Sequence, residues 1–190
     1  MDSFTRVREE IYVITKHAPA DIEHLHSQSV LSIVLRLKPD ADNALKIAAL
    51  SHDIDRSIPE RRVHPEEFKD YNEYKRKHSE RSAEIVVEIM RKCDCDISII
   101  EKTKFLIENH EVGGSGDVEI LKEADSISFF QDNLIYYQKK YPDYFKDKIR
   151  FMYKRLSPRA RLLIRDITLK NIPLEKEVWQ VISEIESSGE

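Results

Sequence analysis

An apolar run ends in an imidazole beside a carboxylate, in the stretch Ala44-Leu45-Lys46-Ile47-Ala48-Ala49-Leu50-Ser51-His52-Asp53. Burying a carboxylate without a partner is strongly unfavourable, and a divalent metal ion is one of the few partners that offset this cost. The run therefore predicts a buried helix whose end presents His52 and Asp53 to a bound metal ion.

The composition of the 190 residues favours an all-α protein. Charged residues make up 35% of the chain, glycine occurs only four times, and strand-like alternation of β-branched residues is nearly absent. The net charge of -4 gives no reason to expect nucleic acid or an anionic membrane as a partner. Because the chain has neither a run of 18 apolar residues nor an apolar leader at Met1, we expect a cytoplasmic protein without a membrane span.

Prolines divide the chain into segments with helical periodicity, since proline is tolerated in the first turn of a helix and poorly in its middle. The pattern predicts helices over residues 2–16, 21–37, 41–52, 65–92, 97–108, 117–139, 144–155, 158–168 and 174–185. Asp40 and Ser157 are the expected N-caps. We interpret the loop Gly113-Gly114-Ser115-Gly116 as a helix break, the alternative being backbone that approaches a phosphate.

Further imidazole and carboxylate groups fall on the apolar faces of different predicted helices. They belong to His26, His78, His110 and Asp125, each at helical spacing from aliphatic neighbours. One such histidine is more often an ordinary core residue than a ligand. Six titratable groups directed at one core would be costly without a shared partner, so the set predicts a metal site.

The order of these residues resembles that of the HD-domain metal-dependent phosphohydrolases, in which a histidine, a His-Asp pair and a distant aspartate follow one another. The matching segments are His26-Ser27-Gln28-Ser29-Val30, Ala48-Ala49-Leu50-Ser51-His52-Asp53-Ile54, His78-Ser79-Glu80-Arg81-Ser82-Ala83-Glu84-Ile85, His110 and Glu123-Ala124-Asp125. The sequence departs from the pattern at Asp55 and Ser82, where many members have glycine. The resemblance implies one HD-type helical bundle over residues 1–190, with a motif-bearing core over about 20–130 and a C-terminal helical extension over about 131–190.

The resemblance also implies a metal-dependent phosphohydrolase. One divalent ion would be held by His26, His52, Asp53 and Asp125, and a second by His78 and His110 with Asp53 as the bridge. Imidazole and carboxylate ligands suit manganese, iron, cobalt, nickel or zinc.

The expected substrate is a small phosphomonoester or phosphoanhydride, with a nucleotide first among the candidates. Arg56 and Arg81 are candidates for binding its phosphate, because guanidinium groups match phosphate oxygens. Asp53, Asp55 and Glu111 are candidates for catalysis.

Two alternatives stay open at this level: an HD-type di-iron oxygenase, and a non-catalytic nucleotide-binding HD protein. The stretch from Lys146 to Arg165 holds eight basic residues and one acid. We interpret it as the solvated faces of two amphipathic helices and not as a nucleic-acid site, because the chain as a whole is acidic. The sequence does not indicate the oligomeric state.

Overall fold

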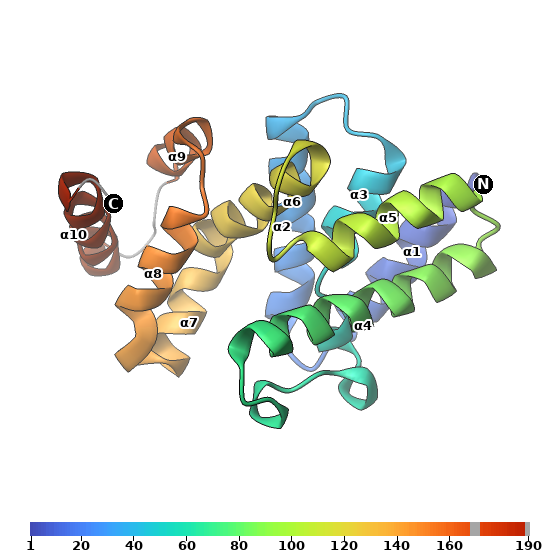
Figure 1. Cartoon of the computed structure of the whole chain (residues 1–190), viewed down its shortest axis with the longest axis horizontal. Coiled ribbons are helices and arrows are strands. Elements are labelled where there is room, and N and C mark those ends of the chain that lie inside the picture. Colours follow the sequence, from blue (N-terminus) through green and yellow to red (C-terminus); the bar gives the residue numbers. More distant parts are fainter. Residues whose placement is uncertain (168–171, 189–190) are drawn as a thin grey trace. The chain divides into compact units, whose positions relative to one another are not determined.

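The computed structural model describes residues 1–167 and 172–188, and every regular element in these ranges is helical, which confirms the predicted all-α fold (Figure 1). The chain divides into two compact units, residues 1–124 and 125–190. This division lies close to the expected boundary near residue 130, while a single domain stays a prediction. None of the helices in the described ranges combines the length and the apolar character that crossing a membrane requires.

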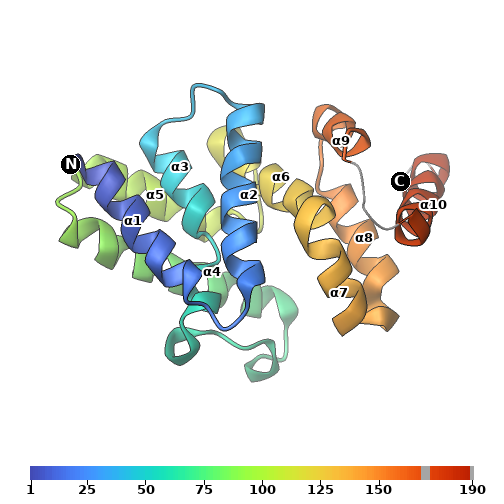
Figure 2. The same cartoon turned by 180° about the vertical axis from the view of Figure 1, so that it is seen from behind.

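The first unit is built around α3 (Asn43–Ser51), the helix of the apolar run. It packs against α1 (Ser3–Lys16), α2 (Asp21–Leu37) and α5 (Ile97–Asn109), and Figure 2 shows it among these helices. Seven of its nine residues are buried. A helix that is apolar on nearly all sides must be enclosed, so the polar groups at its end also lie inside the unit.

Aspartate side chains begin several of these helices. The Leu45 amide donates to Asp42 at 3.0 Å at the start of α3, and the Thr5 amide donates to Asp2 at 2.9 Å at the start of α1. The prediction of Asp40 as the N-cap of α3 is wrong. The Ala41 amide donates to the Lys38 carbonyl, so Asp40 lies within a turn, and α3 begins after Asp42.

The long helix expected over residues 65–92 is interrupted. It is split into a 3₁₀ turn, η3 (Pro65–Glu67), and α4 (Tyr71–Lys92), whose cap Asp70 accepts from the Asn72 amide at 3.0 Å. Two further 3₁₀ turns, η1 (Ile54–Ser57) and η2 (Pro59–Arg61), follow α3. The new start follows from the cap, since an aspartate at that position satisfies the first amides of a helix.

The helix expected over residues 117–139 is also interrupted, into α6 (Gly116–Ser128), a π-helical turn η4 (Phe129–Asn133) and α7 (Leu134–Lys140). Periodicity alone does not report such a turn, because one extra residue leaves the apolar pattern nearly intact.

The glycine loop ends α5 and leads into α6. Gly113 has a φ of 77°, and a Cβ there would lie 2.6 Å from the Lys122 side chain. The Gly114 amide donates to the Glu119 carboxylate at 3.0 Å. Both observations favour the interpretation as a helix break.

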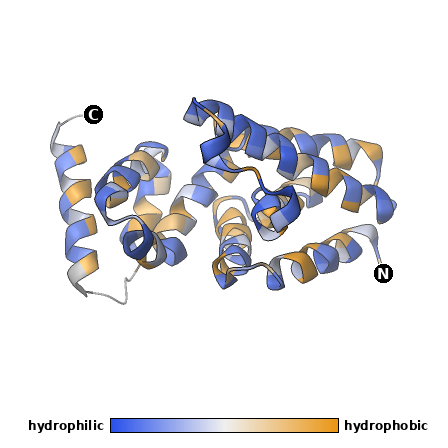
Figure 3. Ribbon diagram, turned by 90° about the horizontal axis from the view of Figure 1, so that it is seen from below, coloured by the Kyte–Doolittle hydropathy of each residue, from blue (hydrophilic) through white to orange (hydrophobic). Residues whose placement is uncertain are grey.

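The second unit contains the end of α6, η4, α7, η5 (Pro142–Tyr144), α8 (Phe145–Lys154), α9 (Pro158–Arg165) and α10 (Ile172–Ser188). Ser157 caps α9 as predicted, whereas the last predicted residue of that helix, Thr168, lies outside the described residues. The helices carry both hydrophobic and hydrophilic residues along their length (Figure 3), and α8 packs against α10. Basic residues of the Lys146–Arg165 stretch pair with acids of α10, as Arg150 does with Glu184 at 3.0 Å.

Candidate metal centre

His52 and Asp53 lie where α3 ends inside the first unit. His52 is the C-cap of α3 and Asp53 precedes η1, and their exposed fractions are 1% and 9%. The neighbouring helices that enclose α3 therefore surround its end with their own side chains. One histidine each comes from α2, from α4 and from the end of α5.

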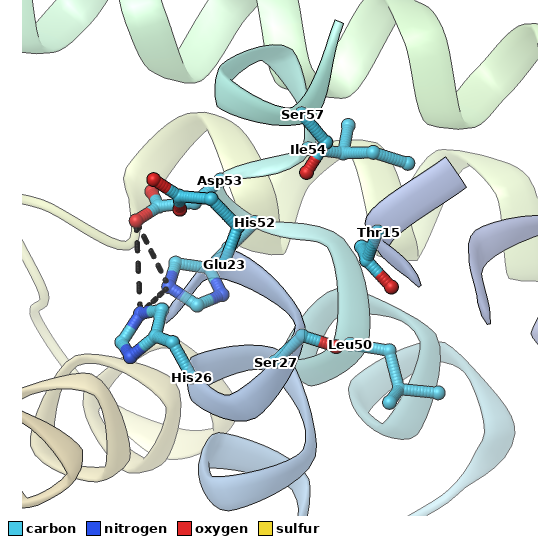
Figure 4. Close-up of a pocket in the computed structure, with 9 residues that line it drawn as sticks. All are labelled: Thr15, Glu23, His26, Ser27, Leu50, His52, Asp53, Ile54 and Ser57. Atoms are coloured by element: carbon cyan, nitrogen blue, oxygen red, sulfur yellow. Dashed lines mark hydrogen bonds and ion pairs between the residues drawn. The ribbon is translucent and has the colours of Figure 1, made fainter. Parts of the chain in front are cut away.

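The first group consists of His26 of α2, His52 and Asp53 (Figure 4). The Nε2 atoms of His26 and His52 are 3.1 Å apart, and they lie 3.6 and 3.7 Å from Asp53 Oδ2. The circle through three atoms with these separations has a radius of about 2.0 Å, which equals the length of a metal–nitrogen bond. A single ion at its centre would be within bonding distance of all three atoms.

The second group consists of Asp53, His78 of α4 and His110, the C-cap of α5. Asp53 Oδ1 lies 2.7 Å from His78 Nε2 and 3.6 Å from His110 Nε2. The two groups therefore use different oxygens of one carboxylate, which is the arrangement in which an aspartate bridges two ions.

Both groups can hold a metal ion, judged by their donor atoms. The four imidazoles and the carboxylate are buried, with exposed fractions from 0 to 9%. So many buried polar groups within a few ångströms are costly unless a shared partner offsets their desolvation. Mixed nitrogen and oxygen donors suit first-row transition ions better than calcium.

The charges in the centre shift the pKa values of Asp53 and His78 strongly. Burial by itself would raise the pKa of Asp53, but Arg56 and the neighbouring His52 and His78 hold it well below its usual range. Burial and the Arg56 charge oppose protonation of His78, yet Asp53 and Asp55 outweigh them and raise the pKa of His78 to about 9. Without a metal ion, His78 is thus a protonated imidazole at neutral pH.

Two charged side chains predicted to act at the site lie beside the centre. Arg56 forms an ion pair with Asp53 Oδ2, and its Nη2 atom is 3.5 Å from His78 Nε2. Glu111 follows His110 directly, with Oε1 4.0 Å from His110 Nε2, and its Oε2 pairs with Lys75 at 3.0 Å. The phosphate-binding role of Arg56 and the catalytic role of Glu111 stay predictions.

The remaining predicted residues lie in different surroundings. Asp55 is fully buried, with Oδ1 2.8 Å from His78 Nδ1. The side chain of Arg81 is 43% exposed and pairs with Glu84 at 3.4 Å. Asp125 is the first residue of the second unit, where Arg155 donates to its carboxylate at 3.0 Å, and its role as a ligand stays a prediction.

One acidic residue beside the centre was missed by the sequence reasoning. Glu23 precedes His26 by three residues and lines, with His26, His52 and Asp53, a cavity of about 10 Å³, roughly the space of one water molecule. Ser27 and Ser57 line the same cavity, and their buried hydroxyl oxygens have no hydrogen-bond partner in the part of the chain that the structure describes. The sequence contained a signal that Glu23 lies near the centre. Glu23 and His26 are three residues apart on α2, and residues at i and i+3 share one face of a helix.

Comparisons with curated proteins and with solved structures gave no match. A family model, by contrast, matches residues 9–176, a range that contains every candidate ligand. The description of this family is a domain of unknown function, DUF4202. Because the match covers most of the sequence, the chain belongs to the DUF4202 family.

Proposed function

We propose that this chain is a divalent-metal-dependent phosphohydrolase of the HD type. The observation that carries the proposal is that Asp53 joins two groups of buried histidines, one through each carboxylate oxygen. His26, His52 and Asp53 would hold one ion, and Asp53, His78 and His110 a second. When bound, the ions supply the charge that activates water for attack on phosphorus and stabilises the phosphate oxygens.

Arg56 is the residue that we assign to the substrate phosphate. Its guanidinium group already contacts Asp53, while 28% of the side chain remains exposed. A guanidinium carries five N–H donors in a planar fork and can hold a carboxylate and a phosphate oxygen together. Arg56 therefore links the metal centre to the place where a phosphate would bind.

The first turns of α4 favour a substrate with an aromatic base. Tyr71, Tyr74, Lys75 and His78 recur at spacings of three and four, so they share one face of the helix. The Tyr74 ring stacks on His78 with 5.9 Å between centroids, and the Tyr71 ring lies 5.4 Å from Tyr74. Tyr71 is 59% exposed, and its ring is available for stacking on a nucleobase whose phosphate lies at the centre.

Glu111 is our candidate for proton transfer to the leaving group. Its carboxylate lies at the edge of the second group, and the ion pair with Lys75 orients it. A carboxylate in this place can take a proton from the attacking water and then give it to the leaving oxygen as the bond to phosphorus breaks.

The test is a double variant, H52A/D53A, compared with wild type and with H64A. His64 is a suitable control because its side chain is 44% exposed and pairs only with Glu66 among the contacts of the described residues. Wild type and H64A should bind manganese or cobalt and release phosphate from nucleotides, whereas the double variant should do neither. Unchanged metal content in the double variant, measured by elemental analysis, would contradict the site.

The same screen separates the two alternatives. Oxygen consumption with a substrate and no phosphate release would favour a di-iron oxygenase. Tight nucleotide binding without product over hours would favour a non-catalytic sensor.

A further inference from the structure

Two histidines of the centre have the outer ring nitrogen held by their own helix. His52 Nδ1 lies 3.3 Å from the Ala49 carbonyl, and His110 Nδ1 lies 2.7 Å from the Ile107 carbonyl. Both histidines are C-caps, where carbonyl groups of the last turn lack the usual helical bond from an amide four residues later. Because a carbonyl oxygen only accepts, Nδ1 carries a proton in each ring and Nε2 is left to face Asp53.

His78 cannot use this arrangement, because it lies in the middle of α4. There the backbone carbonyls accept the amides of the following turn. Instead, His78 Nδ1 lies 2.8 Å from Oδ1 of Asp55, which belongs to η1. His78 is therefore the histidine of the second group whose outer nitrogen faces a charged carboxylate.

Asp55 is itself held from two sides. The Ser82 hydroxyl donates to Asp55 Oδ1 at 3.1 Å, and the Val63 amide donates to Oδ2 at 3.3 Å. Ser82 lies one helical turn after His78, so both approach Asp55 from the same face of α4. Asp55 is 0% exposed and Ser82 is also fully buried. A buried carboxylate held by two hydrogen bonds has one position, and its close ion pair with Nδ1 constrains the position of the His78 ring.

We propose that Asp55 is a positioning residue that orients His78 for the second metal position and strengthens it as a ligand, with Ser82 holding Asp55 in place. The Asp55 carboxylate, 2.8 Å from Nδ1, favours the ring form that keeps its proton on Nδ1, and Nε2 would then be free to bind the ion beside Asp53. A carboxylate in this place makes the imidazole more basic than a carbonyl does, and loss of such a contact weakens metal binding by about 10- to 100-fold. This inference rests on the proposed metal centre.

The proposal predicts unequal effects on the two positions. The first position uses His26, His52 and Asp53 Oδ2, and His78 is not one of its donors. The second position has His78 as one of its donors. Loss of the Asp55 charge should therefore leave one ion tightly bound and weaken the other.

The experiment uses the D55N and S82A variants of the full chain, with S29A as control. Asparagine keeps the size of the side chain and removes its charge. Ser29 is a buried serine on α2 that belongs to neither group of donors, so S29A removes a comparable hydroxyl. Metal-stripped protein is titrated with cobalt by calorimetry and absorption spectroscopy, and thermal unfolding confirms that each variant is folded.

We expect D55N to bind its second cobalt ion about 10- to 100-fold more weakly than wild type, with the first ion unchanged. S82A should show a smaller effect in the same direction, and S29A none. S82A also tests the proposal if D55N does not fold. Equal affinity for the second ion in wild type, D55N and S82A would overturn the proposal.

A second readout separates this inference from the proposed function. In metal-free protein the His78 Nδ1 proton should give a strongly downfield NMR resonance that is absent from H78Q and shifted in D55N. If wild type binds no metal but the resonance depends on Asp55, the proposed function fails and the positioning contact stands. If the resonance is the same in wild type and D55N, the positioning role is excluded.

Discussion

Raising the pH of the metal-free protein should remove a stabilising contribution from His78. The pKa of His78 is raised to about 9, whereas it is 6.5 in a model peptide, which stands for the unfolded chain. A group whose pKa is higher in the folded state stabilises that state fully below its unfolded pKa. The contribution is then lost as the pH rises through the folded pKa. The relevant window is therefore about pH 6.5 to 9.

The magnitude follows from the size of the shift. A rise in the pKa of His78 from 6.5 to about 9 corresponds to about 3 kcal/mol of unfolding free energy. Asp53 has the opposite sign, because its pKa is lowered and its contribution is lost only as the pH falls below the range of a free carboxyl. The alkaline loss is thus a property of His78 and does not arise from Asp53.

The measurement is urea unfolding of wild type, H78Q and H64A with a chelator present, at pH 6.5, 8 and 9.5. The difference in unfolding free energy between wild type and H78Q should fall by about 3 kcal/mol across this range. H64A should follow wild type, because His64 lies outside the centre. A difference between wild type and H78Q that stays constant from pH 6.5 to 9.5 would refute the reasoning.

Four further outcomes are expected. Leu106→Ala empties a site that is 1% exposed in the first unit and should lower the unfolding free energy by about 2–5 kcal/mol in urea titrations. Asp42→Ala removes the N-cap of α3 and should cost about 1 kcal/mol in the same assay. Tyr153→Phe removes the bond from the buried Tyr153 hydroxyl to Glu186 and should lower the midpoint of thermal unfolding, with about 1 kcal/mol lost. Tyr71→Ala should raise KM for a nucleotide on the order of 10-fold and leave KM for a phosphate ester without an aromatic ring unchanged in steady-state assays, because stacking contributes about 1–3 kcal/mol.

Much of the centre could be predicted because its residues follow helix periodicity. His26, His78 and His110 were expected to face the core from three helices. In the structure, the Nε2 atom of each lies within 3.6 Å of an oxygen of the Asp53 carboxylate. The same reasoning could not assign the contact between Asp55 and Ser82, the two positions that depart from the HD-type pattern. They are 27 residues apart on different elements, and periodicity gives the face of a residue without its partner.

Residues that mark the start of a helix gave a wrong boundary where two such residues lay close together in the sequence. Asp40 and Asp42 are both acceptable N-caps, and the turn from Lys38 to Ala41 decides between them. Pro65 is an acceptable first residue of a helix, but the cap at Asp70 starts α4 six residues later. Such choices depend on how the chain packs before the helix begins.

The amino-acid order alone was sufficient for the all-α class and for the histidines and aspartates that turn inward, since side-chain direction on a helix repeats every 3.6 residues. Only the tertiary structure decided that the two groups use different oxygens of Asp53 and that the outer nitrogen of His78 faces Asp55. These are distances between atoms of different helices, and they depend on how the helices pack around α3.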